Sequence, residues 1–266
     1  MDDRLKIVSE FYGEFEEDGR LERSRHGQLE YATTMEYIHR FAKPGAKLIE
    51  LGAGTGRYSL ALAKEGYDVT AVELVDSNLE VLRRKMTSLP EGSVRLQAVS
   101  GDATNLAAFS DESFDVTLSF GPMYHLYESE DVRRAIREAV RVTKKGGVIL
   151  VAFLSVYAIM FDNYLKETLH DGIVENFDAE YRTRHFAEQL FTGYDIVEFE
   201  ELFRSEPVDH VTTVAANTVL ELAEARSDFS MSDEDFREFF RYHLATCEKR
   251  ELLGASSQLL YICRKQ

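Results

Sequence analysis

The segment from residue 48 to residue 56 has the residue types and the spacing of a ligand-binding turn. It reads Leu-Ile-Glu-Leu-Gly-Ala-Gly-Thr-Gly and lies between an expected strand and an expected helix. Glycine at positions 52, 54 and 56 permits a tight turn and lets the backbone approach a ligand closely, with the amides of the helix start facing it. The alternative is a glycine-rich turn with a purely structural role.

Two acidic residues follow at the ends of the next two expected strands. Glu73 comes 21 residues after Gly52, where its carboxylate could accept hydrogen bonds from both hydroxyls of a ribose. Asp102 stands in Gly101-Asp102-Ala103, where it could accept a hydrogen bond from an adenine amino group. Each acid alone is more often a solvated residue at a strand end. Their order along consecutive strands favours one shared site.

The elements that must position these residues alternate along the chain. Apolar residues at helical spacing predict helices over residues 1–17 and 27–42, and Pro44-Gly45 ends the second one. Strands are expected at 47–51, 68–72, 94–99, 114–120, 147–154, 194–203 and 258–263. Helices of ordinary length separate the first five strands, which indicates right-handed βαβ units and a parallel sheet. Further helical regions are expected near 157–192 and over roughly 208–253, the second with a helix that Ser232 opens.

The pattern Glu50-x-Gly52-x-Gly54-x-Gly56, followed by Glu73 and then by Gly101-Asp102-Ala103, resembles the class I S-adenosylmethionine-dependent methyltransferases. The resemblance is close over residues 46–154. It implies an α/β fold with a Rossmann-like, mostly parallel sheet of seven strands whose last strand is antiparallel, and it implies S-adenosyl-L-methionine as the cofactor. An NAD(P)-dependent oxidoreductase remains an alternative, although such enzymes more typically show Gly-x-Gly-x-x-Gly.

The same resemblance implies roles for individual residues. The glycine loop would hold the methionine end of the cofactor, Glu73 the ribose and Asp102 the adenine edge, while Glu50 would help to orient the α-amino group, often through water. Adjoining positions complete the expected site. The expected cofactor-binding residues are Tyr12, Glu50, Gly52, Ala53, Gly54, Gly56, Arg57, Glu73, Leu74, Asp102, Ala103 and Phe120.

The segment Phe120-Gly121-Pro122-Met123-Tyr124-His125-Leu126 follows the fourth strand. It is similar to the same loop in a mostly uncharacterised subset of class I enzymes. His125 could accept a proton from a substrate hydroxyl or amine, because imidazole titrates near neutral pH. It could equally hydrogen-bond to the backbone and hold the loop in place. Tyr124 could line the methyl pocket, and both residues are candidate catalytic residues. No metal-ligand spacing is present, so we expect no metal site.

A second candidate surface lies near the amino terminus, where basic side chains follow Tyr12. This positive group could meet the cofactor carboxylate or an anionic substrate. The more common arrangement is a solvated connector whose charges pair with nearby glutamates. Glu30, at the start of the next helix, could be a surface residue or a cofactor contact. The basic residues are Arg20, Arg23, Arg25 and His26, and the nearby glutamates are Glu16, Glu17 and Glu22.

The resemblance and the element pattern together suggest a division of the chain. Residues 1–42 form an expected helical cover and residues 43–155 the cofactor-binding core. Residues 156–255 are expected to be helical additions around one core strand, at 194–203, that cover the substrate. Residues 256–266 contain the final core strand.

The composition bounds the partners. The 266 residues include 31 Lys or Arg and 47 Asp or Glu, which gives a formal net charge of −16. Such a charge disfavours nucleic acid and anionic membrane surfaces as partners. With two cysteines and no apolar leader, we expect a cytoplasmic protein. A small-molecule acceptor methylated on oxygen or nitrogen is favoured, while an RNA methyltransferase or a non-catalytic adenosylmethionine-binding protein remain alternatives.

Overall fold

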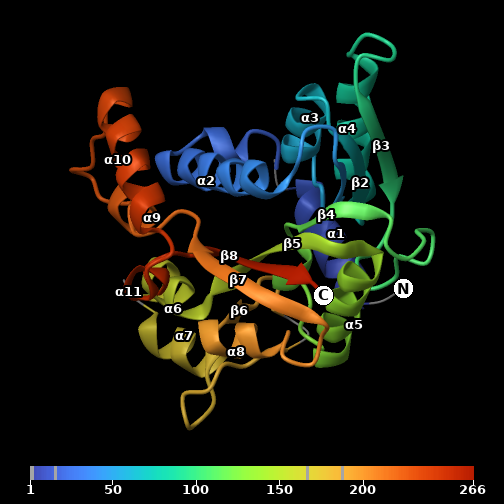
Figure 1. The fold of residues 1–266 in the computed structure, drawn as a ribbon. Helices are drawn as coiled ribbons and strands as arrows, with labels where there is room; N and C mark the ends of the chain where they lie inside the picture. The colour runs from blue at the N-terminus through green and yellow to red at the C-terminus, as the bar shows by residue number, and fades with distance from the viewer. Residues whose placement is uncertain (1–2, 15–16, 166–167, 187–188) are drawn as a thin grey trace.

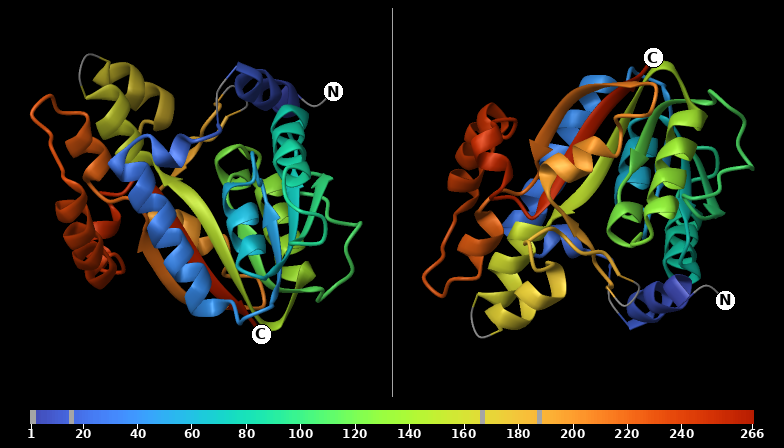
Figure 2. Two further views of the ribbon diagram at one scale, coloured as in Figure 1. Left: turned by 90° about the horizontal axis from the view of Figure 1, so that it is seen from above. Right: turned by 90° about the horizontal axis from the view of Figure 1, so that it is seen from below.

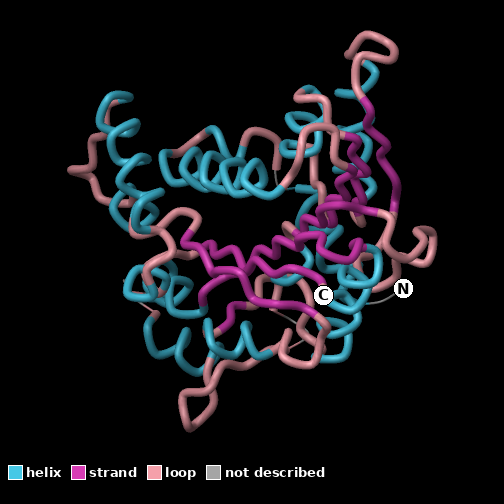
Figure 3. The backbone as a smooth tube through the Cα atoms, viewed as in Figure 1, coloured by secondary structure: helices cyan, strands magenta, loops and turns pink. Residues whose placement is uncertain are grey.

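A mixed β-sheet runs through the molecule and carries helices on both faces (Figure 1). The computed structural model describes residues 3–14, 17–165, 168–186 and 189–266. The strands are β1 (Lys47–Leu51), β2 (Asp68–Glu73), β3 (Arg95–Ser100), β4 (Phe114–Ser119), β5 (Thr143–Ser155), β6 (Gly193–Tyr194), β7 (Val208–Ala215) and β8 (Gln258–Lys265). They form the central band between the helices in Figure 3.

The helices vary widely in length. The longer ones are α1 (Asp3–Glu14), α2 (Arg25–Phe41), α3 (Arg57–Lys64), α4 (Asp76–Thr87), α5 (Ser129–Val142), α7 (Leu169–Asn176) and α10 (Asp233–Thr246). The shorter ones are α6 (Val156–Ile159), α8 (Ile196–Glu201), α9 (Leu220–Glu224), α11 (Arg250–Leu253), the 3₁₀ turns η1 (Arg20–Glu22) and η2 (Pro122–Tyr124), and the π-helical turn η3 (Met160–Tyr164). Figure 1 shows α2 and α3 on one side of the sheet and α5 and α8 on the other.

The strand order is β3-β2-β1-β4-β5-β8-β7, with the short strand β6 paired to β5 off this path. Pairs among β1 to β5 are parallel, whereas β8 runs antiparallel to both of its neighbours. The expected Rossmann-like sheet with an antiparallel last strand is therefore confirmed. The order reverses between β1 and β4, and ligands of open α/β sheets bind at the carboxyl ends of strands beside such a switch point.

The core lies where apolar strands meet apolar helix faces. Leu48, Ile49 and Leu51 of β1 are fully buried, as expected of a central parallel strand covered on both faces. The periodic apolar residues of α5, such as Ile136, are buried against the sheet while its arginines stay in solvent. This packing fixes the ends of β1, β2 and β4 relative to one another.

Two expectations for the carboxyl-terminal third were wrong. The expected strand at 194–203 is the two-residue strand β6 followed by the helix α8, because the Asp195 carboxylate accepts hydrogen bonds from the amides of residues 197 and 198 and starts a helix. The long helical region expected from residue 208 begins instead with strand β7, which pairs with β8. Its run of valine and threonine favours a strand.

Other expectations for this region hold in part. The helical region expected near 157–192 contains α6, η3 and α7, and no helix is assigned to the described residues between Asn176 and Gly193. Ser232 does open a helix, since its side chain and that of Asp235 form a reciprocal capping box at the start of α10. Among the helices of the described ranges, none is long and apolar enough to cross a membrane.

Candidate active site

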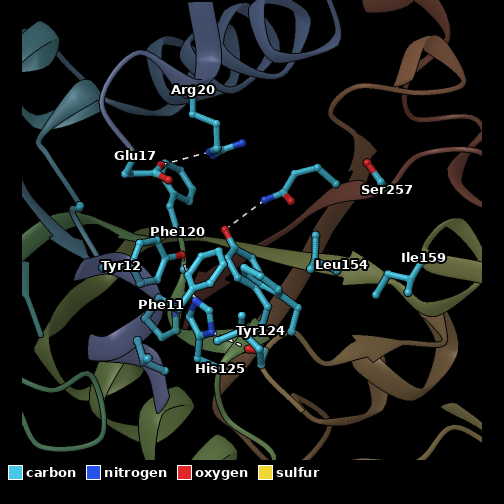
Figure 4. A pocket seen from close by; sticks show the side chains of 18 of the residues that line it. Phe11, Tyr12, Glu17, Arg20, Phe120, Tyr124, His125, Leu154, Ile159 and Ser257 are labelled. Carbon is cyan, nitrogen blue, oxygen red and sulfur yellow. Dashed lines mark hydrogen bonds and ion pairs between the residues drawn. The ribbon is translucent and has the colours of Figure 1, made fainter. Parts of the chain in front are cut away.

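A cavity of about 630 Å³ opens at the carboxyl ends of the strands. Its walls come from three parts of the chain: the strand ends, the amino-terminal segment around Tyr12 and Arg20, and the segments that follow β5. Figure 4 shows Tyr12 and Arg20 on one side of this cavity and Ile159 and Ser257 on the other. In both views of Figure 2, α1 lies beside α4, near the loop that leads to β6.

The glycine turn adopts the left-handed backbone that favours glycine, with φ of 76° at Gly52, 54° at Gly54 and 85° at Gly56. A Cβ atom at Gly52 would lie 2.9 Å from Cδ of Pro122, so this glycine lets the loop after β4 approach. At Gly54, the nearest atom to such a Cβ is Cγ of Glu17, at 3.6 Å. Gly54 therefore leaves space in the cavity wall. Gly56 packs against a leucine of α4 and does not line the cavity.

Glu73 joins the turn to the end of β2. Its Oε2 accepts a hydrogen bond from the Gly54 amide at 2.6 Å, and its Oε1 accepts one from the Val75 amide at 2.8 Å. Burial raises the pKa of this carboxyl, while the two amides oppose that shift. The Asn78 side chain also hydrogen-bonds to this carboxylate, which keeps acceptor capacity for one further donor. Leu74 lines the cavity next to it.

Asp102 lines the same cavity beyond β3. Its Oδ1 accepts a hydrogen bond from the Thr104 amide at 2.8 Å, which orients the carboxylate within the turn. Gly101 and Ala103 line the cavity on either side of it. The structure thus brings the turn, Glu73 and Asp102 to one space, together with Phe120 at the end of β4.

Three expected cofactor residues lie beside the main cavity. Glu50, Ala53 and Arg57 line a smaller adjoining cavity of about 60 Å³. Glu50 is fully buried and accepts a hydrogen bond from the Ser59 hydroxyl, and burial raises its pKa to about 8. The guanidinium of Arg57 pairs with Glu22 and lies 4.3 Å from the ring centre of Tyr31, so its charge is already engaged.

His125 connects three segments. A nitrogen that contacts a backbone carbonyl must carry the proton, and Nδ1 lies 2.8 Å from the Leu190 oxygen. In the neutral ring Nε2 is then an acceptor, and it lies 3.1 Å from the Tyr12 hydroxyl, which donates to it. Burial raises the pKa of Tyr12, so the phenol stays protonated. The loop after β4 is thereby tied to α1 and to the segment before β6.

Tyr124 lies beside His125 and is buried. Its hydroxyl accepts a hydrogen bond from the Gln258 amide at 3.2 Å, and its backbone oxygen accepts one from the Thr192 amide at 2.8 Å. Burial raises the pKa of the phenol. Tyr124 lines both cavities, at the boundary between the strand ends and the segments after β5.

The basic residues of the amino-terminal segment separate into two groups. Arg20 lines the cavity and pairs with Glu17, at 3.1 Å, and with buried Glu30, at 3.3 Å. Arg25 and His26 contact α10 and α9, where their partners are Asp233 and Glu224, and His26 also lines the cavity. Arg23 donates to the Asp18 carbonyl. The expected pairing with nearby glutamates is right for Glu17. Glu30 is buried in the cavity wall and is not a surface residue, so a contact with the cofactor stays a prediction. Glu16, another expected partner, lies outside the described residues.

Several cavity residues come from segments that the sequence interpretation treated only as a cover. They include Ile159, Asp162, Gln189 and Glu221, while Leu154 and Ser257 line the cavity from segments expected to belong to the core. Their positions depend on how η3, α9 and the start of β8 pack together. A single sequence offers no local signal for such a meeting of distant segments.

Comparison with known proteins now bears on this site. A model of the methyltransferase domain family matches residues 49–151, which hold the glycine turn, Glu73, Asp102 and His125. Residues 49–151 are therefore similar to the methyltransferase domain family.

Individual curated proteins are also similar to part of this chain. A demethylmenaquinone methyltransferase of Clavibacter sepedonicus is 38% identical over 128 residues, which are 46% of this chain and 49% of that protein. The uncharacterized methyltransferase YbaJ of Bacillus subtilis is 27% identical over 161 residues, 58% of this chain and 60% of that protein. The chain thus spans about half the length of the first curated relative. The similarity centres on the methyltransferase domain.

A solved structure resembles the whole arrangement. The S-adenosylmethionine-dependent methyltransferase from Methanosarcina mazei superposes with a TM-score of 0.57 at 15% identity, over 86% of this chain and 96% of that one. At this identity the likeness supports the fold alone. The match to the methyltransferase domain family ends at residue 151, before the segments that line the far side of the cavity.

Proposed function

We propose that this protein transfers a methyl group from S-adenosylmethionine to an oxygen or nitrogen atom of a small molecule. One observation carries the proposal: the turn at Gly54, the carboxylate of Glu73 and the carboxylate of Asp102 face one cavity at the ends of consecutive strands. Their order along the chain matches a methyltransferase domain. The cavity is large enough for an adenosyl group and an acceptor together.

The residues present fit the cofactor. The open space at Gly54 admits the methionine end, and Glu73 and Asp102 keep acceptor capacity for ribose hydroxyls and an adenine amino group. Arg20 lines the same space and is the candidate partner for a carboxylate. Glu50, behind the turn, would act on the α-amino group. When bound, the cofactor supplies a methyl group on a positively charged sulfur.

The protein's own residues position the reactants and exclude water. Tyr12 and His125 close the cavity between α1 and the loop after β4, and buried Tyr124 separates the adenosyl side from the far side. Because both ring nitrogens of His125 have partners, we assign it as a positioning residue. Positioning of this kind supplies much of the rate when the methyl donor is already reactive.

We do not propose for this protein the methyl acceptor that the names of its relatives give. Several of these relatives are named demethylmenaquinone methyltransferases, but the residues on the far side of the cavity follow residue 151 and lie outside the family match. We propose a small-molecule acceptor rather than a nucleic acid on the basis of the charge of −16. We also propose that the reaction takes place in the cytoplasm, since Cys247 and Cys263 are free thiols.

Titration calorimetry with S-adenosylhomocysteine and with NAD tests the proposal. We expect heat of binding with S-adenosylhomocysteine and none with NAD. Asp102→Ala should weaken the binding by about tenfold, because a hydrogen bond in a closed site is lost. Binding of NAD alone would replace this function with an oxidoreductase. Binding of S-adenosylhomocysteine without methyl transfer to any small molecule would indicate a non-catalytic binder.

A further inference from the structure

The far side of the cavity has a distinct chemical character. We call it the acceptor lobe and define it by Asp162, Glu175, Gln189, Glu221 and the apolar residue Ile159. These residues come from the segments after β5, and Figure 4 shows one of them, Ile159, across the cavity from Tyr12. If the proposed function holds, the acceptor occupies this lobe, because Glu73 and Asp102 line the opposite end.

Acidic side chains outnumber basic ones in the cavity wall. The acidic lining residues are Glu17, Glu30, Glu73, Asp102, Asp162, Glu175 and Glu221, whereas Arg20 is the one arginine or lysine among the described lining residues. Arg20 pairs with two of these acids on the adenosyl side. Three carboxylates therefore face the acceptor lobe without a lysine or arginine in its described wall.

The hydrogen bonds of these lobe carboxylates come from neutral groups. Glu175 accepts from the Tyr164 hydroxyl at 2.8 Å, and Glu221 accepts from the Ser257 hydroxyl and from the Asn217 amide at 3.3 Å. Neutral donors orient a carboxylate but leave its charge. The imidazole of His26 also lines the cavity, and its Nδ1 is engaged with Glu224 at 2.8 Å.

A chain of buried amides ends beside the lobe in an acceptor atom, Oε1 of Gln189, that is itself buried. The Gly172 carbonyl can only accept, so the Asn176 side-chain nitrogen, at 2.9 Å, must face it. The Asn176 oxygen then faces the Gln189 side-chain nitrogen, at 3.1 Å. This leaves Oε1 of Gln189 as the end of the chain. Gln189 is 7% exposed, lines the cavity, and its Oε1 has no hydrogen-bond partner among the described residues.

Asp162 reflects the same excess of negative charge. Burial and the nearby Glu221 carboxylate raise its pKa to about 6, and His26 opposes the shift. A buried acceptor without a donor and carboxylates without a cation are both costly until a ligand supplies what is missing. The ligand that would complete this wall carries positive charge and several N–H donors.

We propose that the acceptor lobe binds a small molecule with a protonated amine, held by Asp162, Glu221 and Oε1 of Gln189. This inference rests on the proposed function. An ammonium group has three donors, which matches three acceptors, and Ile159 and Leu154 offer apolar contacts to its carbon skeleton. The ammonium is the recognition group here, since a protonated nitrogen has no lone pair to receive a methyl group.

Matched probes test this inference by titration calorimetry with the full chain, both alone and with saturating S-adenosylhomocysteine. Phenethylamine, phenethyl alcohol and hydrocinnamate share a phenylethyl skeleton and differ in the charge of the end group. We expect phenethylamine to bind at least about tenfold more tightly than the other two. Equal or tighter binding of hydrocinnamate or the alcohol, or no binding of the amine, would overturn the inference.

Single-residue variants distinguish a loss of amine binding in the acceptor lobe from a general loss of folding. Asp162→Asn and Glu221→Gln keep the side-chain shape and remove one charge each, and each should weaken phenethylamine binding by about tenfold while leaving S-adenosylhomocysteine binding unchanged. Asp171→Asn, on the exposed surface of α7, is the matched control and should change neither. Normal S-adenosylhomocysteine binding without amine preference refutes only this inference. If S-adenosylhomocysteine does not bind, the proposed function is refuted instead. The titration of phenethylamine into the protein alone then still tests the acceptor lobe.

Discussion

Two glutamates at neighbouring strand ends differ because their surroundings differ. Glu50 lies in β1 behind the glycine turn, where it accepts a hydrogen bond from the Ser59 hydroxyl and burial raises its pKa to about 8. Glu73 lies at the end of β2, where two backbone amides stabilise its ionised form. The first carboxyl is therefore poised to change protonation near neutral pH.

Glu50→Gln should change how stability depends on pH. The folded-state pKa of Glu50, about 8, is above the ordinary value of 4.5. Its contribution to stability is therefore fully present below about pH 4.5 and is lost as the pH rises to about 8. Glutamine keeps the acceptor for Ser59 without the charge. Relative to the wild type, the variant should gain on the order of 2–4 kcal/mol between pH 5 and pH 8.5.

Urea unfolding of the apo protein at both pH values measures this difference, and Glu80→Gln on the exposed side of α4 is the control. Equal pH dependence in the wild type and in Glu50→Gln would show that Glu50 is ionised in the folded protein. In the presence of S-adenosylhomocysteine, Glu50→Gln should also bind more weakly if Glu50 acts on the α-amino group.

His125 offers a test of positioning against base catalysis. If it positions α1 and the segment before β6, His125→Ala should weaken S-adenosylhomocysteine binding and raise amide exchange in residues 3–14, because two hydrogen bonds are lost. His125→Asn should restore part of both, since its amide can donate to the Leu190 carbonyl. His39→Ala removes an exposed histidine as control. A pure base would act only during transfer, so unchanged affinity and exchange would contradict the positioning role.

At the scale of elements, the turn between β1 and α3 is the part of the site that depends most on backbone shape. Gly54 and Gly45 both have left-handed backbone, with φ of 54° and 74°, but only Gly54 lines the cavity. Gly54→Ala and Gly45→Ala should each cost about 1–2 kcal/mol of stability. Only Gly54→Ala should also lower the affinity for S-adenosylhomocysteine, by about tenfold or more, because its methyl group enters the ligand's space.

The pair is measured by calorimetry and by thermal unfolding in parallel. Equal loss of affinity in both variants would mean that backbone strain, rather than occupied space, controls binding. Normal affinity in Gly54→Ala would remove this turn from the cofactor site.

The elements that the sequence predicted well are those with strong periodicity. The glycine turn, β1 to β5 and α5 all have local patterns that match their final environment. The secondary-structure prediction was wrong at residues 196–201 and 208–215, because short apolar runs with β-branched residues fit either a helix or a strand. The first segment is a helix because Asp195 caps its start, and the second is a strand because it pairs with β8.

At the scale of the whole molecule, the site joins segments that are distant in sequence. The strand ends could be placed from sequence because parallel strands share a carboxyl edge. The acceptor lobe could not, because Asp162, Gln189 and Glu221 meet only through the packing of η3, α9 and the segment before β6. The amide chain that ends at Gln189 likewise depends on a contact between α7 and a loop.

The net charge of −16 adds a long-range component to this local chemistry. A negative protein attracts a cationic amine, and salt screens that attraction over about 10 Å at 0.1 M. The dissociation constant of phenethylamine should therefore rise about threefold to tenfold between 25 and 300 mM NaCl, as measured by calorimetry. S-adenosylhomocysteine, a zwitterion without net charge, should change by less than about twofold over the same range. Phenethyl alcohol is the neutral control, and an equal salt dependence for the alcohol and the amine would mean that charge does not select the acceptor.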